Sequence, residues 1–127
     1  MKMLQAGTRM RNTRCLVIKG KKRSDREMKH VGIKLRTIPA GDFLDEYRKL
    51  PVDDDVRNMA AKLIEGARDR SGPSEQDVIN GIKSFKVAQM LMAREDCDAI
   101  TMDCLGALGK TKVSLPCIAW SKMNDVG

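Results

Sequence analysis

The residues best placed to do chemistry follow a short apolar stretch near the end of the chain. Ala99–Met102 has the composition of a buried strand, and Asp103, Cys104 and Leu105 come directly after it. In an α/β protein, side chains that follow a strand lie at the carboxyl edge of the sheet, where ligands bind. Asp103 is the main candidate. A carboxylate there can bind a metal ion, a sugar hydroxyl or a backbone amide, or it can cap the next turn.

The cysteines and the single histidine form no recognisable reactive pattern. Cys15, Cys97, Cys104 and Cys117 include no Cys-x-x-Cys pair, and His30 lies far from all four. These spacings argue against a zinc site and against a disulfide framework. We expect the thiols to be small buried hydrophobic groups and His30 to be an exposed side chain. A Ser-His-Asp or Cys-His catalytic pair is not indicated.

A glycine- and lysine-containing segment follows Leu105 and invites comparison with a P-loop. A P-loop has four residues between its first glycine and the Gly-Lys-Ser/Thr group, whereas residues 106–111 (GALGKT) have two. We therefore expect a flexible loop here. A nucleotide or phosphate binder that uses this loop is kept as a third functional hypothesis.

The chain is basic, with 24 Lys and Arg against 17 Asp and Glu and a formal net charge of +7. Most of the excess lies within the first 30 residues. Such a cluster is typical of phosphate or nucleic-acid contact, of a solvated face, or of contact with another domain. Because no aromatic residue lies among these basic residues, the stacking platform of an RNA or single-strand binder is missing. We do not expect nucleic acid as a partner.

The length and composition predict one globular domain over residues 1–127. A chain of this size with 42% apolar residues has room for a modest core. No apolar run is long enough to span a membrane, and residues 1–14 lack the apolar core of a secretion signal. We therefore expect a cytoplasmic protein with no membrane partner.

Three strands are predicted. Arg14–Ile18 is a β-branched apolar run, residues 31–38 alternate apolar and polar side chains as a half-buried edge strand does, and Ala99–Met102 is the third. Residues 1–12 are interpreted as a polar lead-in and residues 21–28 as a short helix or a loop.

Helices are predicted for residues 42–50, 51–67, 74–95 and 115–127. Asp42 can cap the first, Pro51 and the aspartates after it favour the start of the second, and Ser74 with Asp77 resembles a capping box. In the last helix we expect Ile118, Ala119 and Met123 to face inward, with Gly127 as its stop. Strands separated by helices pair in parallel. The fold class is therefore α/β: a small three-layer Rossmann-like or flavodoxin-like domain with a short parallel sheet flanked by helices.

Four segments spread over nearly the whole chain carry a resemblance. They are GTRMR at 7–11; VGIKL at 31–35 followed by GDFL at 41–44; DAITMDCLG at 98–106; and LPCIAWSKMNDVG at 115–127. In this order and spacing they resemble the second, central domain of the L-fucose isomerase and L-arabinose isomerase superfamily, especially its sugar-isomerase-like members. Such proteins are large, multidomain and usually oligomeric, and they interconvert aldoses and ketoses with a divalent cation, commonly manganese.

The resemblance implies that this chain carries part of a sugar site. Met10 and Arg11 match the family's substrate-facing lead-in, and Asp103, Cys104 and Leu105 match the place where its third strand opens toward the cleft. In the family the metal stabilises charge on the sugar oxygens while carboxylates move the proton. The implied partners are the neighbouring domains, the sugar and further copies in a homo-oligomer.

The family's metal ligands are not matched in this sequence. In the family, the glycine that corresponds to Gly127 precedes an acidic motif whose glutamate binds the metal, and His30 matches none of the later ligands. We therefore expect a fragment or lone domain that binds no cofactor alone and is inactive by itself. The alternative is a non-enzymatic interaction module whose basic N-terminal face binds a polyanion or a partner protein.

Overall fold

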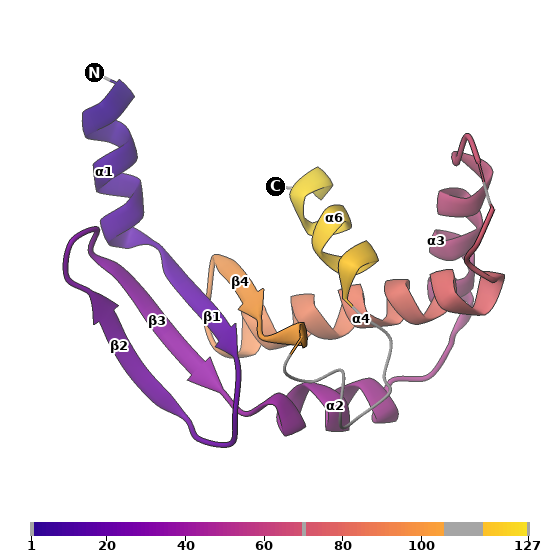
Figure 1. Cartoon of the computed structure of the whole chain (residues 1–127), viewed down its shortest axis with the longest axis horizontal. Helices are drawn as coiled ribbons and strands as arrows, with labels where there is room; N and C mark the ends of the chain where they lie inside the picture. The colour runs from indigo at the N-terminus through magenta and orange to yellow at the C-terminus, as the bar shows by residue number, and fades with distance from the viewer. Residues whose placement is uncertain (1, 70, 106–115, 127) are drawn as a thin grey trace. The chain divides into compact units, whose positions relative to one another are not determined.

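The computed structural model of the chain describes residues 2–69, 71–105 and 116–126. Its elements, shown in Figure 1, are α1 (Lys2–Asn12), β1 (Arg14–Ile18), β2 (Ser24–Met28), β3 (Ile33–Ile38), α2 (Ala40–Lys49), α3 (Asp54–Glu65), α4 (Glu75–Arg94), β4 (Ala99–Met102) and α6 (Cys117–Val126). The residues group into two compact units, which are described separately. The first comprises residues 1–43 and 90–103, and the second residues 44–89 and 104–127.

The first unit is built on an open four-stranded sheet in the order β2-β3-β1-β4. β1 runs parallel to both β3 and β4, whereas β2 is antiparallel to β3 (Figure 1). In register, Ile18 at the end of β1 lies beside Ile38 of β3 and Met102 of β4. The predicted α/β class, with a short and mainly parallel Rossmann-like sheet, is confirmed.

The buried residues of the first unit come from the central strands β1 and β3 and from the adjoining ends of α2 and α4. Leu16 and Ile18 of β1 and Ile38 of β3 have no exposed surface, and Phe43 and Leu91 are also buried. The alternation of buried and half-buried residues along β1 is that of a strand inside a sheet. β1 is therefore the strand around which this unit packs.

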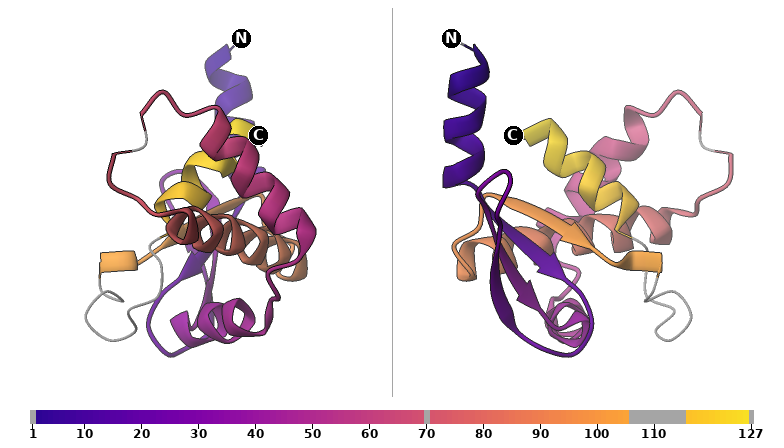
Figure 2. Two further views of the ribbon diagram at one scale, coloured as in Figure 1. Left: turned by 90° about the vertical axis from the view of Figure 1, so that its right-hand side faces the viewer. Right: turned by 60° about the vertical axis from the view of Figure 1, so that its left-hand side comes forward.

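Three predictions about the elements of the first unit are wrong: the short helix or loop at residues 21–28, the edge position of the strand at 31–38, and the polar lead-in at 1–12. Residues 24–28 form the strand β2, so β3 has a neighbour on each side and is not an edge strand. All five residues of β2 (SDREM) are exposed. Because neither face of this strand is buried, its sequence lacks the alternation of apolar and polar residues by which a strand is predicted. The polar lead-in is in fact the helix α1, which leads into the amino end of β1, as the right-hand view of Figure 2 shows.

The second unit is helical, and α4 begins at the predicted capping box. The prediction that Asp42 caps α2 is wrong, because that helix begins at Ala40 and Asp42 lies in its first turn. Asp53, which was not predicted as a cap, caps α3. The Asp53 carboxylate accepts a hydrogen bond from the N–H of Val56 at 2.9 Å, at the start of α3. At the start of α4, the N–H of Asp77 donates to Ser74 Oγ at 3.2 Å, and the N–H of Ser74 donates to Asp77 Oδ2 at 2.9 Å. This reciprocal pair is the predicted capping box. Hydrogen bonds from Ser74 also lower the pKa of Asp77.

The core of the second unit joins α3, α4 and α6. Its buried residues are Val56, Ala60, Val78, Ile79 and Ile82, and Ile118 of α6 packs against them. A Cβ atom on Gly81 of α4 would lie 2.8 Å from the Cβ of Ile118, so only glycine permits this approach of the two helices. Ala119 is buried and Ile118 and Met123 are half-buried, as predicted; Gly127 lies outside the described residues. Among the described residues, no helix is long and apolar enough to cross a membrane.

Candidate functional site

The strand order of the sheet changes direction at β1. The chain passes from β1 to β3 on one side and later returns to β4 on the other side of β1. In open α/β sheets, ligands bind beyond the carboxyl ends of the two strands at such a switch point. Here these ends are Ile18 and Met102, which pair in register. Lys19 and Asp103, the next residues, therefore occupy the position at which a ligand is expected.

Lys19 and Asp103 are fixed through their backbones and exposed through their side chains. The N–H of Asp103 donates to the C=O of Ile18 at 3.1 Å, and the N–H of Lys19 donates to the C=O of Ile38 at 3.0 Å. Asp103 Oδ2 lies 4.0 Å from Lys19 Nζ, and the two side chains are 44% and 66% exposed. The pair thus presents an acceptor and a donor to solvent at a defined position.

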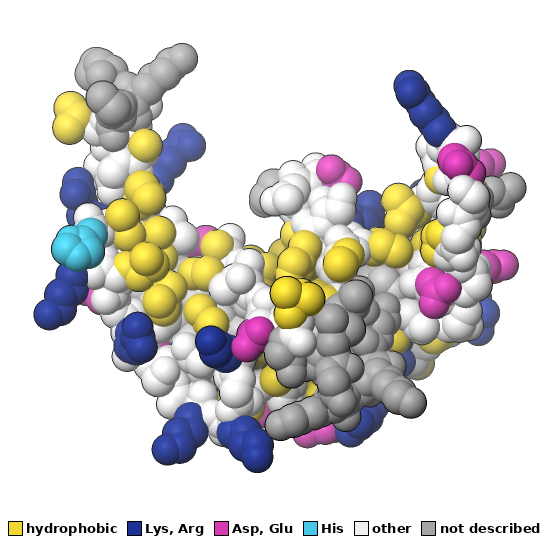
Figure 3. Space-filling view, in the orientation of Figure 1, with side chains coloured by type: hydrophobic (Ala, Val, Ile, Leu, Met, Phe, Trp, Pro, Cys, Tyr) yellow, Lys and Arg dark blue, Asp and Glu magenta, His cyan; other side chains and the backbone are white. Residues whose placement is uncertain are grey.

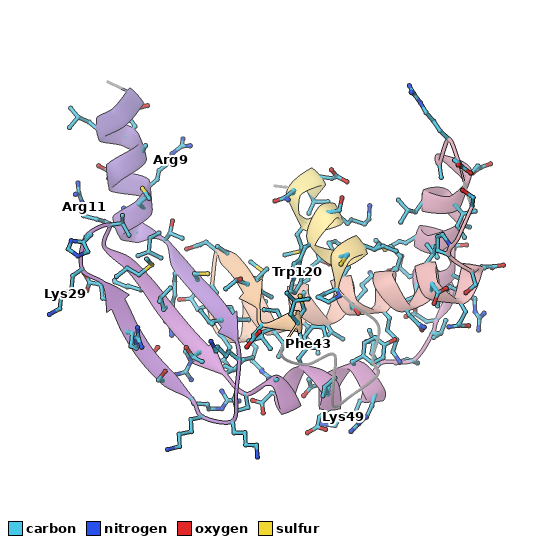
Figure 4. All side chains as sticks on the ribbon, viewed as in Figure 1. Arg9, Arg11, Lys29, Phe43, Lys49 and Trp120 are labelled. Carbon is cyan, nitrogen blue, oxygen red and sulfur yellow. The ribbon has the colours of Figure 1, made fainter. Side chains whose placement is uncertain are left out.

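Met10 and Arg11 lie at the other end of β1. They belong to the last residues of α1, just before β1 begins, and both are exposed (Figure 4 labels Arg11). A Cβ atom on Gly32 would lie 2.5 Å from the Cγ of Arg11, so the stem of Arg11 lies against the turn between β2 and β3. The structure therefore does not bring these two residues together with Asp103.

The remaining predicted residues are described only in part. Cys104 is half-buried and Leu105 is 77% exposed, and both belong to the second unit. The segment 106–111, which was compared with a P-loop, lies outside the described residues.

The four thiols are free, and the prediction that they are buried is wrong for Cys117, which is exposed; the other three are half-buried. Burial raises the pKa of the Cys15 and Cys97 thiols, which disfavours the reactive thiolate. His30 is exposed, as predicted.

No divalent-cation site is evident in the part of the chain that the structure describes. No three His, Cys, Asp or Glu side chains there are close enough to share a metal ion. At Asp103 the charge partner is the ammonium group of Lys19, which would repel a cation. The described residues therefore do not fit the manganese that the resemblance implies.

An ion-pair network around Glu95 was not predicted. Glu95 Oε2 accepts from Arg36 Nε at 2.8 Å and Glu95 Oε1 accepts from Arg23 Nη1 at 3.0 Å, with the Glu95 side chain only 10% exposed. Arg36 also pairs with Asp25 at 2.7 Å, and Arg23 with Asp42. The hydrogen bond from Arg36 is the main cause that lowers the pKa of Glu95. These pairs join β3, α2 and the end of α4 and are structural.

The second unit has a pocket of its own, with a volume of about 380 Å³. Leu63, Ile64, Val78 and Ile118 supply its apolar walls, and Asp69 and Glu75 are among its polar residues. Because a sugar needs many convergent polar groups, this apolar lining suits a hydrocarbon group better.

No protein-family model matches the chain, and no curated protein matches it. The likeness to sugar isomerases therefore rests on the four sequence segments alone.

Proposed function

We propose that this chain is a sugar-binding central domain of an aldose–ketose isomerase-like protein of the L-fucose and L-arabinose isomerase type. The observation that carries the proposal is the position of Asp103, which follows β4 at the switch point beside β1. The sequence resemblance independently selects the same residue as part of the sugar cleft. A general rule of α/β sheets and a sequence likeness thus agree on one carboxylate.

The Lys19–Asp103 pair has the chemistry that sugar hydroxyls require. A hydroxyl both donates and accepts hydrogen bonds, a carboxylate only accepts them, and an ammonium group only donates them. Neighbouring hydroxyls of one sugar can therefore bind Asp103 and Lys19 at the same time. Hydrogen bonds to charged groups are roughly twice as strong as neutral ones.

The proposal assigns no catalytic step to the described residues. They do not fit a divalent cation, so the metal and the carboxylates that move the proton belong to other parts of the proposed enzyme. Neighbouring domains and further copies of the chain would complete the cleft. The role of this domain is to shape the cleft and to bind the sugar.

Titration with unmodified aldoses and ketoses, followed through the backbone amide signals in NMR spectra, tests this function. We expect the signals of Lys19 and Asp103 to shift, and Asp103→Asn to weaken binding about tenfold, or about 1.4 kcal/mol. Asp45→Asn, a change of the same charge on α2, should bind as the parent chain does. Equal affinities of Asp103→Asn and the parent, or no shift at either residue, would contradict the proposal. Aldose–ketose turnover by this chain with manganese would contradict the expectation that the chain alone is inactive.

A second candidate is a polyanion- or protein-binding module, favoured by the charges at the amino end of the sheet. In Figure 4, Arg11 on α1 and Lys29 on the turn after β2 lie on one side of α1 and Arg9 projects from the other side. Figure 3 shows Lys and Arg side chains around a hydrophobic patch on α1 and the sheet. If the chain binds a polyanion, the logarithm of the association constant should fall linearly as the logarithm of the salt concentration rises. No binding to heparin at low salt would exclude the polyanion.

A further inference from the structure

The connection between β1 and β2 carries more positive charge than the surrounding carboxylates neutralise. Residues 19–23 have the sequence KGKKR. Lys19 is paired with Asp103, and Arg23 with Asp42 and Glu95. Lys21 and Lys22 are exposed, and across the described ranges neither of them makes an ion pair. Two positive charges are therefore left unneutralised.

These charges lie at the edge of the sheet that also carries the candidate sugar site. The connection begins at the carboxyl end of β1, where the N–H of Lys19 donates to Ile38. The N–H of Ala40, at the start of α2, donates to the C=O of Gly20 at 3.1 Å. These bonds hold the base of the connection beside the ends of β1 and β3. Figure 3 shows Lys and Arg side chains projecting from this part of the first unit.

We propose that Lys21 and Lys22 form a subsite for a phosphoryl group, so that the ligand of the candidate site is a sugar phosphate rather than a neutral sugar. This inference rests on the proposed function. A phosphate monoester carries about −1.5 to −2 charges at neutral pH, which matches the two unneutralised lysines. Lysine binds phosphate as a compact point charge. Asp103 binds the hydroxyl groups, and Lys19 shields its charge from the phosphoryl group.

A polyanion is the competing ligand for any pair of lysines. Asp103 and Asp42 at this edge of the sheet are each paired with a cation, so Lys21 and Lys22 are the two positive charges left there, enough for one phosphoryl group. The distribution of charge therefore favours a small ligand.

The test compares three probes at fixed ionic strength: an aldopentose, its 5-phosphate and inorganic phosphate. Affinities are measured by NMR titration for the parent chain and for the double variant Lys21→Gln/Lys22→Gln. We expect the 5-phosphate to bind at least tenfold more tightly than the neutral sugar, and the double variant to lose this difference while it keeps the affinity for the neutral sugar. Lys49→Gln/Lys62→Gln, which changes the net charge equally in the second unit, should behave as the parent chain does.

The outcomes separate this inference from the proposed function. Equal affinities for the sugar and its phosphate would overturn the subsite and leave the sugar site intact. Lysine-dependent binding of phosphate without binding of the neutral sugar would support the subsite and overturn the sugar site. Inorganic phosphate that binds as tightly as the ester would support the subsite and identify free phosphate as its ligand. Tighter, lysine-dependent binding of a DNA duplex, with a steep dependence on salt, would overturn it in favour of a polyanion surface.

Discussion

Asp98 and Asp103 flank β4, the first immediately before the strand and the second immediately after it. Asp98 is bonded to β1 in both directions: its Oδ2 accepts from the N–H of Arg14 at 3.0 Å, and its own N–H donates to the C=O of Arg14 at 2.8 Å. Asp103 donates its backbone N–H to the C=O of Ile18 in β1, and its carboxylate, 44% exposed, lies 4.0 Å from Lys19 Nζ. The same residue type thus serves as a structural tie at one end of the strand and as an exposed acceptor at the other.

The contrast extends to the residues around each aspartate. At the amino end, the stem of Arg11 lies against Gly32. The Glu95 network is not confined to that end, because it joins Arg36 of β3 to Arg23 and Asp42 at the carboxyl edge. At the carboxyl end, Lys19, Lys21 and Lys22 are exposed. Substitutions at the amino end should therefore lower stability, whereas substitutions at the carboxyl end should lower ligand affinity.

The largest loss of stability is expected from Glu95→Ala. The change removes the carboxylate that accepts hydrogen bonds from Arg36 and Arg23 and leaves both guanidinium groups beside the sheet. Because hydrogen bonds to charged groups contribute about 1.5–3 kcal/mol each, and both arginines keep a second carboxylate, we expect a loss of about 2–3 kcal/mol. Urea denaturation measures it. Glu65→Ala, at the exposed end of α3, is the matched control, and an equal effect of the two changes would rule out the structural role.

The same carboxylate makes stability depend on pH. The pKa of Glu95 is lowered in the folded chain, chiefly by Arg36, so the folded state binds the proton less readily than the unfolded state does. The contribution of the ionised Glu95 carboxylate to the free energy of unfolding is complete above the ordinary pKa of a glutamate. It is lost as the pH falls from that value through the lower folded pKa. The parent chain should therefore lose more stability than Glu95→Ala on acidification, and parallel curves would contradict this.

Gly32→Ala should have the next largest effect. Gly32 has a φ of +74°, a conformation that costs other residues about 1–2 kcal/mol. The new Cβ would also meet the Cγ of Arg11 at 2.5 Å, close to the backbone of α1. We expect a loss of about 2 kcal/mol in thermal or urea unfolding. Gly41→Ala is the control, because its Cβ would meet nothing within 4 Å and alanine favours a helix.

The parts of the fold that the sequence predicts are those that local patterns determine. The capping box of Ser74 with Asp77 depends on residues three positions apart, and this prediction is confirmed. The cap at Asp53 was not predicted, and Asp42, which was predicted as a cap, lies inside α2. β1 is an apolar run that lies inside the sheet between β3 and β4. β4 was found as an apolar run too, but among the described strands it lies at the edge and its residues are half-buried or exposed, so the prediction of a buried strand is wrong. β2 could not be found in this way, since its residues are all exposed and its pairing with β3 alone makes it a strand.

In the candidate site, too, a local pattern identifies one residue, and the others are brought together only by the fold. Asp103 was found because the end of an apolar strand marks the carboxyl edge of a sheet. Its partner Lys19 lies 84 positions away in the chain and could be identified only from the register of β1 with β4. Arg11 was grouped with Asp103 through the resemblance, and only the sheet topology places them at opposite ends of β1. The ion pair of Glu95 with Arg23 could not be predicted for the same reason, because the two residues are 72 positions apart in the chain.

The smallest changes in stability test the comparison most directly, because one substitution can be made at both ends of β4. Asp98→Ala removes the acceptor for the N–H of Arg14, and we expect a loss of about 1 kcal/mol with sugar affinity unchanged. Asp103→Ala removes an exposed ion pair and should change stability by less than about 0.5 kcal/mol while it abolishes sugar binding. Urea unfolding and NMR titration of both variants give the two readouts. If Asp103→Ala proves the more destabilising, its carboxylate is structural as well, and the distinction between the two ends of the strand is wrong.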